Sequence, residues 1–282
     1  MMPMLEDKNR ISILDTTLRD GELAPGVQMT LVQKIKLAQF LEAAGVDIIE
    51  VGYPGQFDRD LEAIRQVSWH LKQAVVCGLA GAKEAEIIKV VKALEPAKNA
   101  RIHLYTNVRL TPKQNRAQVL ETIATSIAIA RQYCNDIQWS AFDATRSQRS
   151  FLHRAIETAI AGGATTINIP DSLGLATPAE FSHLIRTITT EVKNIDRAVL
   201  SVHCHDDRGM AVENSIAGID VGVRQIECSV RGLGARKGNA DLERVAIAIL
   251  NRWGDRIAVN PAAIETAANF VDGILFKTRQ ST

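Results

Sequence analysis

The chain alternates between short runs of β-branched and aliphatic residues and longer segments in which apolar residues recur at helical spacing. Each short run is bounded by Gly, Pro, Asn or Asp, as the ends of strands usually are. The longer segments have the period of amphipathic helices. The pattern predicts eight strands, over Ile11–Thr16, Asp47–Gly52, Ala74–Gly78, Arg101–Tyr105, Ile137–Phe142, Thr166–Ile169, Leu200–His205 and Gln225–Ser229.

Helices are expected between these strands, and several have recognisable starts. Thr30, Thr111 and Thr177 can each cap a helix with a hydroxyl, and the last two precede a proline at the first helical position. The helices predicted in this way include Leu31–Ala44, Ala82–Leu94, Pro112–Gln132, Phe151–Ala161, Pro178–Val192, Ala211–Asp220, Asn239–Trp253 and Pro261–Lys277.

Eight strands alternating with helices over 282 residues predict a closed (β/α)8 TIM barrel of the α/β class. The alternative, a doubly wound open sheet, would usually carry a Gly-rich turn after its first strand, where this chain has Thr16 to Glu22. We therefore expect one catalytic domain over residues 1–282. Its barrel would occupy about residues 11–250, followed by a helical extension over residues 251–282.

Composition narrows the class of protein. The formal net charge of +1 gives no electrostatic basis for binding nucleic acid or an anionic membrane. The apolar runs are too short to span a bilayer, and Met1 to Arg10 lack the apolar core of a secretion signal. The four cysteines lie far apart, as buried free thiols do in a reducing compartment. We expect a cytoplasmic protein with neither nucleic acid nor membrane as a partner.

Ionisable residues gather where the predicted strands end, which is the active-site end of such a barrel. His203 and His205 are two positions apart on a strand, so both rings project from one side. Asp20 follows the first strand, which neighbours the last strands when a barrel closes. Asp206 and Asp207 could orient the imidazoles. The histidine pair alone is equally compatible with a hydrogen-bonded pair in the core.

Carboxylate and imidazole ligands suit a divalent cation such as Mg2+, Mn2+ or Zn2+. The absence of cysteine from this set argues against a closed structural zinc site. Arg19, beside Asp20, would add a fixed positive charge that could stabilise a developing enolate or alkoxide. The alternative for Arg19 is a surface arginine without a role in chemistry.

Five segments together resemble the DRE-TIM metallolyase superfamily, and the resemblance runs from Ile11 to about Leu250. The last of them is similar to the Claisen-condensing branch, which contains 2-isopropylmalate, homocitrate and citramalate synthases. It lacks the cysteine-bearing glycine loop of the lyase branch. The segments are Leu14–Glu22, Val46–Pro54, Ile167–Asp171, Val202–Asp207 and Gly232–Glu243.

The resemblance implies a role for each matching residue. It implies that the metal ligands are Asp20, His203, His205 and Asn239. Arg19 would stabilise the enolate oxygen, and Glu50 would belong to the polar floor of the site. His103 and Ser140 would line the side chain of a 2-oxo acid. Ser172, at a position that the family fills with threonine, would bind the substrate carboxylate.

Three features depart from the family. Leu23 replaces a glutamine, and Phe142 replaces a glutamate of the catalytic site. The full-length synthases continue into a helical subdomain whose His and Tyr assist proton abstraction, often across a dimer, whereas this chain ends at Thr282. The chain is therefore interpreted either as part of a longer protein or as a barrel-only enzyme with another base. A homodimer is expected from the resemblance.

The resemblance favours an acyltransferase of leucine-type amino-acid biosynthesis that condenses acetyl-CoA with a 2-oxo acid. Two alternatives remain, a lyase or aldolase of the same fold and an inactive barrel that serves as a subunit. Phe142, supported by Leu23 and Tyr105, suggests a 2-oxo acid with an uncharged, branched or aromatic side chain, because a ring replaces a charged acid. Alternatively, Phe142 turns away from the site and fills the core.

Overall fold

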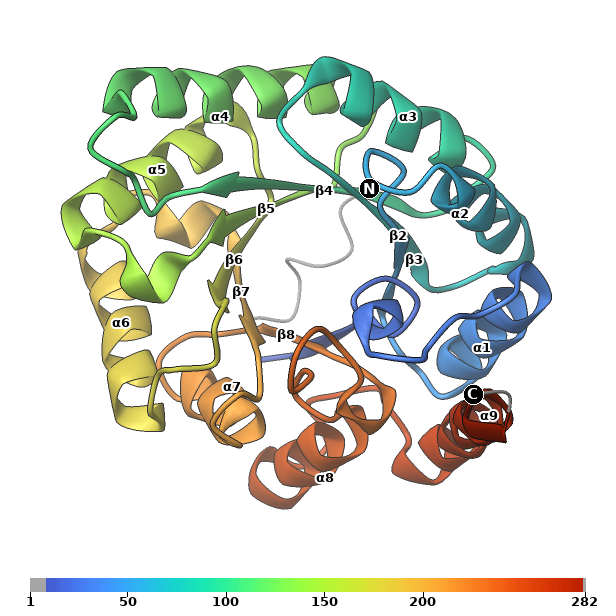
Figure 1. Ribbon diagram of the computed structural model, residues 1–282. Coiled ribbons are helices and arrows are strands. Elements are labelled where there is room, and N and C mark those ends of the chain that lie inside the picture. The colour runs from blue at the N-terminus through green and yellow to red at the C-terminus, as the bar shows by residue number, and fades with distance from the viewer. Residues whose placement is uncertain (1–8, 281–282) are drawn as a thin grey trace.

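Eight parallel strands close into a barrel in the computed structural model, which describes residues 9–280 and the side chains up to residue 276. Each strand pairs with its neighbours in chain order, and β1 pairs with β8 to close the ring (Figure 1). The predicted (β/α)8 fold is confirmed. The strands are β1 (Ser12–Asp15), β2 (Ile48–Gly52), β3 (Val75–Ala80), β4 (Ala100–Asn107), β5 (Ile137–Phe142), β6 (Thr166–Asp171), β7 (Val199–Cys204) and β8 (Gln225–Cys228).

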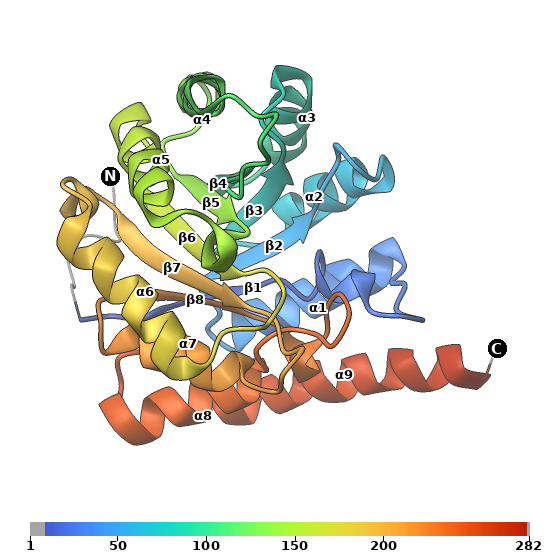
Figure 2. The same ribbon diagram turned by 60° about the vertical axis from the view of Figure 1, so that its left-hand side comes forward.

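A helix follows each strand, and together the helices form a ring around the barrel (Figure 1). One further helix, α9, packs against α1 and α8. Figure 2 shows α9 running along the outside of the barrel and extending past it on the side to which the strands point. The helices are α1 (Leu31–Ala43), α2 (Arg59–His70), α3 (Glu84–Leu94), α4 (Arg116–Arg131), α5 (Arg149–Gly162), α6 (Pro178–Glu191), α7 (Ala211–Ile219), α8 (Leu242–Trp253) and α9 (Pro261–Gln280).

Two of the three predicted helix caps are confirmed and the third is wrong. Thr30 and Thr177 each form a capping box, with Gln33 and Glu180 as the reciprocal residues. The predicted start at Thr111-Pro112 is wrong. The Thr111 hydroxyl donates to Gln114, and α4 begins only after the cap of Asn115, whose side chain accepts from two backbone N–H groups. The chain thus spends four residues in a loop before the helix starts.

The start of α8 differs from the prediction too. The segment was expected to be helical from Asn239, but Asp241 is the cap and the helix begins at Leu242. Asn239 instead forms an isolated bridge with His205, and its side chain reaches Asp20. This displacement of three residues brings Asn239 to the strand ends.

The barrel interior is polar where the strands begin. Arg101 is buried and donates from Nη1 to the side chains of Gln138 at 3.0 Å and Gln225 at 2.6 Å. Gln225 donates in turn to Gln138 and Ser201. Because every strand is covered by helices outside, the aliphatic core lies between sheet and helices. Besides the polar network, a separate small apolar cluster contains Leu14, Ile48 and Cys77.

All four cysteines are free thiols. Cys77, Cys204 and Cys228 are buried as predicted, whereas Cys134 is only half-buried. Among residues 9–280, no helix combines the length and the apolar character that crossing a bilayer requires. The prediction that Met1 to Arg10 carry no secretion signal concerns a segment of which residues 1–8 lie outside the described residues.

Candidate active site

A cavity of about 460 Å3 opens at the carboxyl ends of the strands. Of the ten predicted site residues, Glu50 and Asn239 lie directly behind its wall, both buried. The structure therefore brings all ten together in one place. The eight that line the cavity are Arg19, Asp20, His103, Ser140, Phe142, Ser172, His203 and His205.

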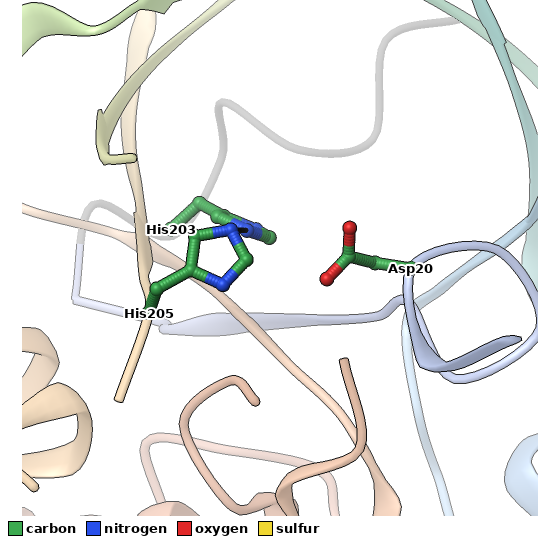
Figure 3. A group of neighbouring side chains, drawn as sticks. All are labelled: Asp20, His203 and His205. Carbon is green, nitrogen blue, oxygen red and sulfur yellow. Dashed lines mark hydrogen bonds between the residues drawn. The ribbon is translucent and has the colours of Figure 1, made fainter. Parts of the chain in front are cut away.

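Asp20, His203 and His205 form the candidate metal centre. One ligand atom from each of the three buried side chains lies within 4.8 Å of the others. The two imidazoles project from the end of β7, and the carboxylate of Asp20 faces them from the loop after β1 (Figure 3). The pairing of β1 with β8 brings these distant segments together, as expected for a closed barrel.

Hydrogen bonds fix which nitrogen of each imidazole carries the proton. His203 donates from Nδ1 to Glu227 at 2.9 Å, and His205 donates from Nδ1 to the carbonyl of Gly238 at 3.1 Å. Both acceptors can only accept, so in the neutral form of each imidazole the lone pair lies on Nε2. The two Nε2 atoms lie 3.3 Å apart. Two lone pairs directed at one point are suited to a cation.

The expectation that Asp206 and Asp207 orient the imidazoles is wrong. Asp206 accepts from the backbone N–H of Ala211 at the start of α7. Asp207 accepts two hydrogen bonds from Arg236. Both residues lie beyond the end of β7, and these hydrogen bonds engage their carboxylates before α7 begins. The orienting carboxylate comes from Glu227 on the neighbouring strand.

The charge states of Asp20 and His205 also suit a cation. Burial raises the pKa of Asp20, but Arg19 and the two histidines lower it by more than burial raises it. The net pKa is about 2. Burial and the neighbouring His203 lower the pKa of His205 to about 4. For His203, burial lowers the pKa, but the bond and charge of Glu227 outweigh it and the net pKa is raised. Asp20 is thus anionic and His205 neutral at pH 7.

Asn239 offers a fourth donor atom. Its Nδ2 donates to Asp20 Oδ2 and to the carbonyl of Leu233, both at 2.8 Å. Its Oδ1 is buried without a hydrogen-bond partner in the part of the chain that the structure describes. A buried acceptor without a partner is costly. A cation beside Asp20 would supply that partner, so the residues fit a divalent metal.

Two glycines allow the loop before Asn239 to pack closely. A Cβ on Gly234 would lie 2.3 Å from Asn239 Nδ2 and 2.8 Å from Asp20 Oδ2. A Cβ on Gly238, whose φ is +99°, would lie 2.0 Å from the carbonyl oxygen of Gly232. The glycines of this loop are therefore explained by the close packing of the loop on the candidate metal centre.

A chain of hydrogen bonds runs from Arg19 across the barrel. Arg19 donates from Nη1 to Asp20 at 2.7 Å and from Nε to Glu50 at 2.6 Å. Glu50 also accepts from Thr16 at 2.7 Å and from His103 Nδ1 at 2.6 Å. His103 Nε2 therefore accepts from the hydroxyl of Ser140, at 2.7 Å. Arg19 is not a free surface arginine, because two buried carboxylates hold it.

These contacts set the ionisation of the arginine and its partner. Burial raises the pKa of Glu50, but Arg19 and His103 lower it by more, and the net pKa lies well below the usual range. Burial lowers the pKa of Arg19, and Glu50 and Asp20 raise it above its ordinary value. The cavity thus has a permanent cation beside the candidate metal centre.

Ser172 and Phe142 also line the cavity. The Ser172 hydroxyl accepts from the backbone N–H of Asp143 at 2.9 Å, which leaves its own proton free to donate. Phe142 is 45% exposed, and its ring lies edge-on to Tyr105 with centroids 6.2 Å apart. The alternative that Phe142 fills the core is therefore wrong. Leu23 lines the same cavity.

Some residues of the site were not predicted. Glu227 had one usable signal, since a charged acid in the middle of a buried strand needs a partner. Asn168 donates to Ser140 at 2.7 Å, and Tyr53 lines the cavity. Both residues lie in segments that resemble the family, but nothing local identifies their side chains as part of the site.

The family model described as HMGL-like matches residues 10–271. The chain belongs to the HMGL-like family. This match confirms the superfamily expected from the five sequence segments. It covers all eight strands of the barrel.

Curated relatives of this HMGL-like chain are named 2-isopropylmalate synthase. One, from Rhodopseudomonas palustris (strain BisB5), is 46% identical over 248 residues, which are 86% of this chain and 47% of the relative. Another, from Caulobacter vibrioides (strain NA1000 / CB15N), is 42% identical over 279 residues, which are 96% of this chain and 53% of the relative. The chain therefore spans about half the length of the curated relatives it matches.

Solved structures similar to the HMGL-like barrel share its fold. Hydroxymethylglutaryl-CoA lyase from Pseudomonas aeruginosa matches with a TM-score of 0.78 at 21% identity, covering 95% of this chain and 93% of the lyase. The carboxyl transferase domain of pyruvate carboxylase from Rhizobium etli has a TM-score of 0.78 at 15% identity, covering 97% of this chain and 48% of that chain. Identities this low support the fold alone.

Proposed function

We propose that this chain is the catalytic barrel of a 2-isopropylmalate synthase-like acyltransferase, which condenses acetyl-CoA with a 2-oxo acid. In this reaction the methyl carbon of the acetyl group loses a proton and bonds to the ketone carbon, whose oxygen takes up a proton and becomes a hydroxyl. Water then cleaves the thioester, releasing CoA and a 2-alkylmalate. The observation that carries the proposal is the buried Asp20–His203–His205 set with Arg19 beside it, together with identity above 40% to relatives of that name.

Asp20, His203 and His205 would hold a divalent cation, with the free Oδ1 of Asn239 as a fourth donor. Mg2+, Mn2+ and Zn2+ all suit such a mixed set of oxygen and nitrogen donors. When bound, the cation would act as a Lewis acid that polarises the ketone of the 2-oxo acid. Glu227 and the Gly238 carbonyl would keep both imidazoles in the tautomer that binds.

Arg19 would stabilise negative charge on oxygen. Its guanidinium is held by Asp20 and Glu50, so it needs no rearrangement when charge develops in the cavity. Preorganised positive charge is most effective where water is excluded, and this side chain is only 15% exposed. The side chain is therefore in position before the reaction begins.

The remaining predicted residues would bind and orient the 2-oxo acid. Ser172 has a free hydroxyl proton for the substrate carboxylate. His103 and Ser140 use their hydrogen bonds on Glu50 and on each other, so they would shape the cavity rather than exchange protons. Phe142 would contact the side chain of the substrate. The same proposal includes a homodimer and a barrel that spans about residues 11–250.

Product analysis tests the proposal. The full chain is incubated with acetyl-CoA, Mg2+ or Mn2+ and one 2-oxo acid at a time, and the products are identified by mass spectrometry. We expect a 2-alkylmalate and free CoA. A parallel incubation contains hydroxymethylglutaryl-CoA and the same metals. Its cleavage, without condensation in the first assay, would assign a lyase, and no turnover in either assay would favour an inactive barrel.

A further inference from the structure

We propose that Tyr53, Tyr105 and Phe142 form an aromatic wall that selects 2-oxo acids with an aromatic side chain. We further propose that Glu86, which binds the wall from behind, makes it reject 2-oxo acids that carry a second carboxylate. The inference rests on the proposed function, because it names the substrate of the same cavity. All three rings of the aromatic wall line that cavity.

The three rings form a continuous edge-to-face row. The centroids of Tyr53 and Tyr105 lie 6.0 Å apart with an interplanar angle of 89°, and those of Tyr105 and Phe142 lie 6.2 Å apart at 61°. Tyr53 directly follows β2, Tyr105 lies near the end of β4, and Phe142 is the last residue of β5. Such a row presents both edges and faces, which are the surfaces that another aromatic ring packs against.

The hydroxyl groups of the aromatic wall have a fixed direction. Tyr53 donates to Glu86 Oε2 at 2.6 Å, because a carboxylate can only accept. The Tyr53 proton is therefore committed, and in the 3.2 Å contact between the two hydroxyls Tyr105 must be the donor. Tyr105 is left with lone pairs alone for any ligand. A carboxylate placed there would meet acceptors, with the charge of Glu86 behind them.

Two glycines fit closely around this arrangement. A Cβ on Gly55 would lie 2.6 Å from both Glu86 Oε2 and the Tyr53 ring. A Cβ on Gly81 would lie 2.7 Å from Glu86 Oε2, and the Gly81 N–H donates to that same oxygen at 3.0 Å. Backbone and side chains thus hold Glu86 against Tyr53. The pair is a built feature of the cavity.

The arginine side chains of the cavity do not offset the rejection of a second substrate carboxylate. Three arginines line it, and each already faces a carboxylate. Arg19 binds Asp20 and Glu50, and Arg236 binds Asp207 through two hydrogen bonds. Arg59 lies 3.7 Å from Glu22 and stacks on the ring of Phe57. A second substrate carboxylate would therefore compete with acids of the protein.

Binding without turnover tests the inference. Phenylpyruvate, 2-oxoisovalerate and 2-oxoglutarate are each titrated calorimetrically into the full chain with Mn2+ and no acetyl-CoA. We expect phenylpyruvate to bind at least about tenfold more tightly than 2-oxoglutarate, because the carboxylate of the latter loses hydration without gaining donors. Equal or tighter binding of 2-oxoglutarate would overturn the inference.

Two variants test the role of the Phe142 ring and the role of the hydroxyl direction separately, and a third serves as a control. Phe142→Leu should weaken phenylpyruvate binding by about two- to tenfold, the range of one aromatic pair, and leave 2-oxoisovalerate within about twofold. Tyr53→Phe keeps the ring but frees the Tyr105 proton to point into the cavity, so it should narrow the gap between phenylpyruvate and 2-oxoglutarate. Tyr133→Phe, at an exposed tyrosine outside the cavity, is the matched control and should change neither. An unchanged gap in Tyr53→Phe would overturn the role of the hydroxyls.

The outcomes distinguish the inference from the proposed function. If the chain condenses acetyl-CoA with 2-oxo acids but binds 2-oxoglutarate best, the proposed function stands and the inference fails. If no 2-oxo acid binds and none supports release of CoA, both fail together.

Discussion

Asn239 donates from Nδ2 to Asp20 Oδ2 at 2.8 Å, and the same bond leaves Asn239 Oδ1 buried and facing no donor among the described residues. The amide therefore presents an oxygen where the candidate metal ligands meet. Asn239→Ala should lower Mn2+ affinity by about ten- to a hundredfold, on the scale of lost supporting contacts at metal sites. Titration calorimetry measures this, with the exposed Asn135→Ala as the control. Unchanged affinity would mean that Asn239 serves only the packing of its loop.

Removal of a principal ligand should have a larger effect. His203→Ala or Asp20→Ala is expected to abolish metal binding while the barrel stays folded, because the ligands stand at strand ends rather than in the hydrophobic core. Elemental analysis of the purified variants gives the metal content, and circular dichroism reports the fold. Full metal occupancy in both variants would show that the site is assigned wrongly.

Arg19→Lys separates charge from geometry. Lysine keeps the positive charge but cannot donate to Asp20 and Glu50 through a planar fork. Metal content should be unchanged, and turnover should fall by roughly a hundred- to a thousandfold, the scale for loss of one preorganised oxyanion contact. Steady-state release of CoA checks this. Turnover equal to that of the natural protein would remove Arg19 from the mechanism.

Asp15 should make stability depend on pH. Burial raises its pKa from 3.8 to about 7, against hydrogen bonds from Thr17 that lower it. Because the folded pKa is the higher one, its stabilising contribution is complete below about pH 4 and is lost as pH rises toward 7. Asp15→Asn keeps an acceptor for the Thr17 N–H and removes the ionisation.

The free energy of unfolding should therefore fall between pH 5 and pH 8 by about 2–3 kcal/mol more in the natural protein than in Asp15→Asn. Urea denaturation at a series of pH values measures the difference. Parallel pH profiles for the two proteins would contradict a raised pKa at Asp15.

The sequence predicts the parts of this molecule that depend on local pattern. The strand Ile137–Phe142 is reproduced residue for residue, since its bounds are set by alternation and flanking polar residues. Asn239 was expected to start a helix, but tertiary contacts with Asp20 and Leu233 hold it outside. A contact between residues more than two hundred positions apart leaves no local pattern.

Partners within the site were harder to predict than ligands. His203 and His205 are marked by their spacing on a strand, whereas Glu227, which orients His203, comes from the next strand. The bond between Tyr53 and Glu86 likewise joins a strand end to a helix. Such pairs depend on how strands and helices pack in three dimensions, which periodicity does not report.

Metal-dependent condensation is tested most directly by measuring the release of CoA from acetyl-CoA by the full chain in the presence of a 2-oxo acid. The release is measured before and after divalent cations are removed with a chelator. We predict release that requires the 2-oxo acid, stops on chelation and returns when Mg2+ or Mn2+ is added back. Release that persists without divalent cations, or no release under any of these conditions, would contradict a metal-dependent condensation at Asp20, His203 and His205.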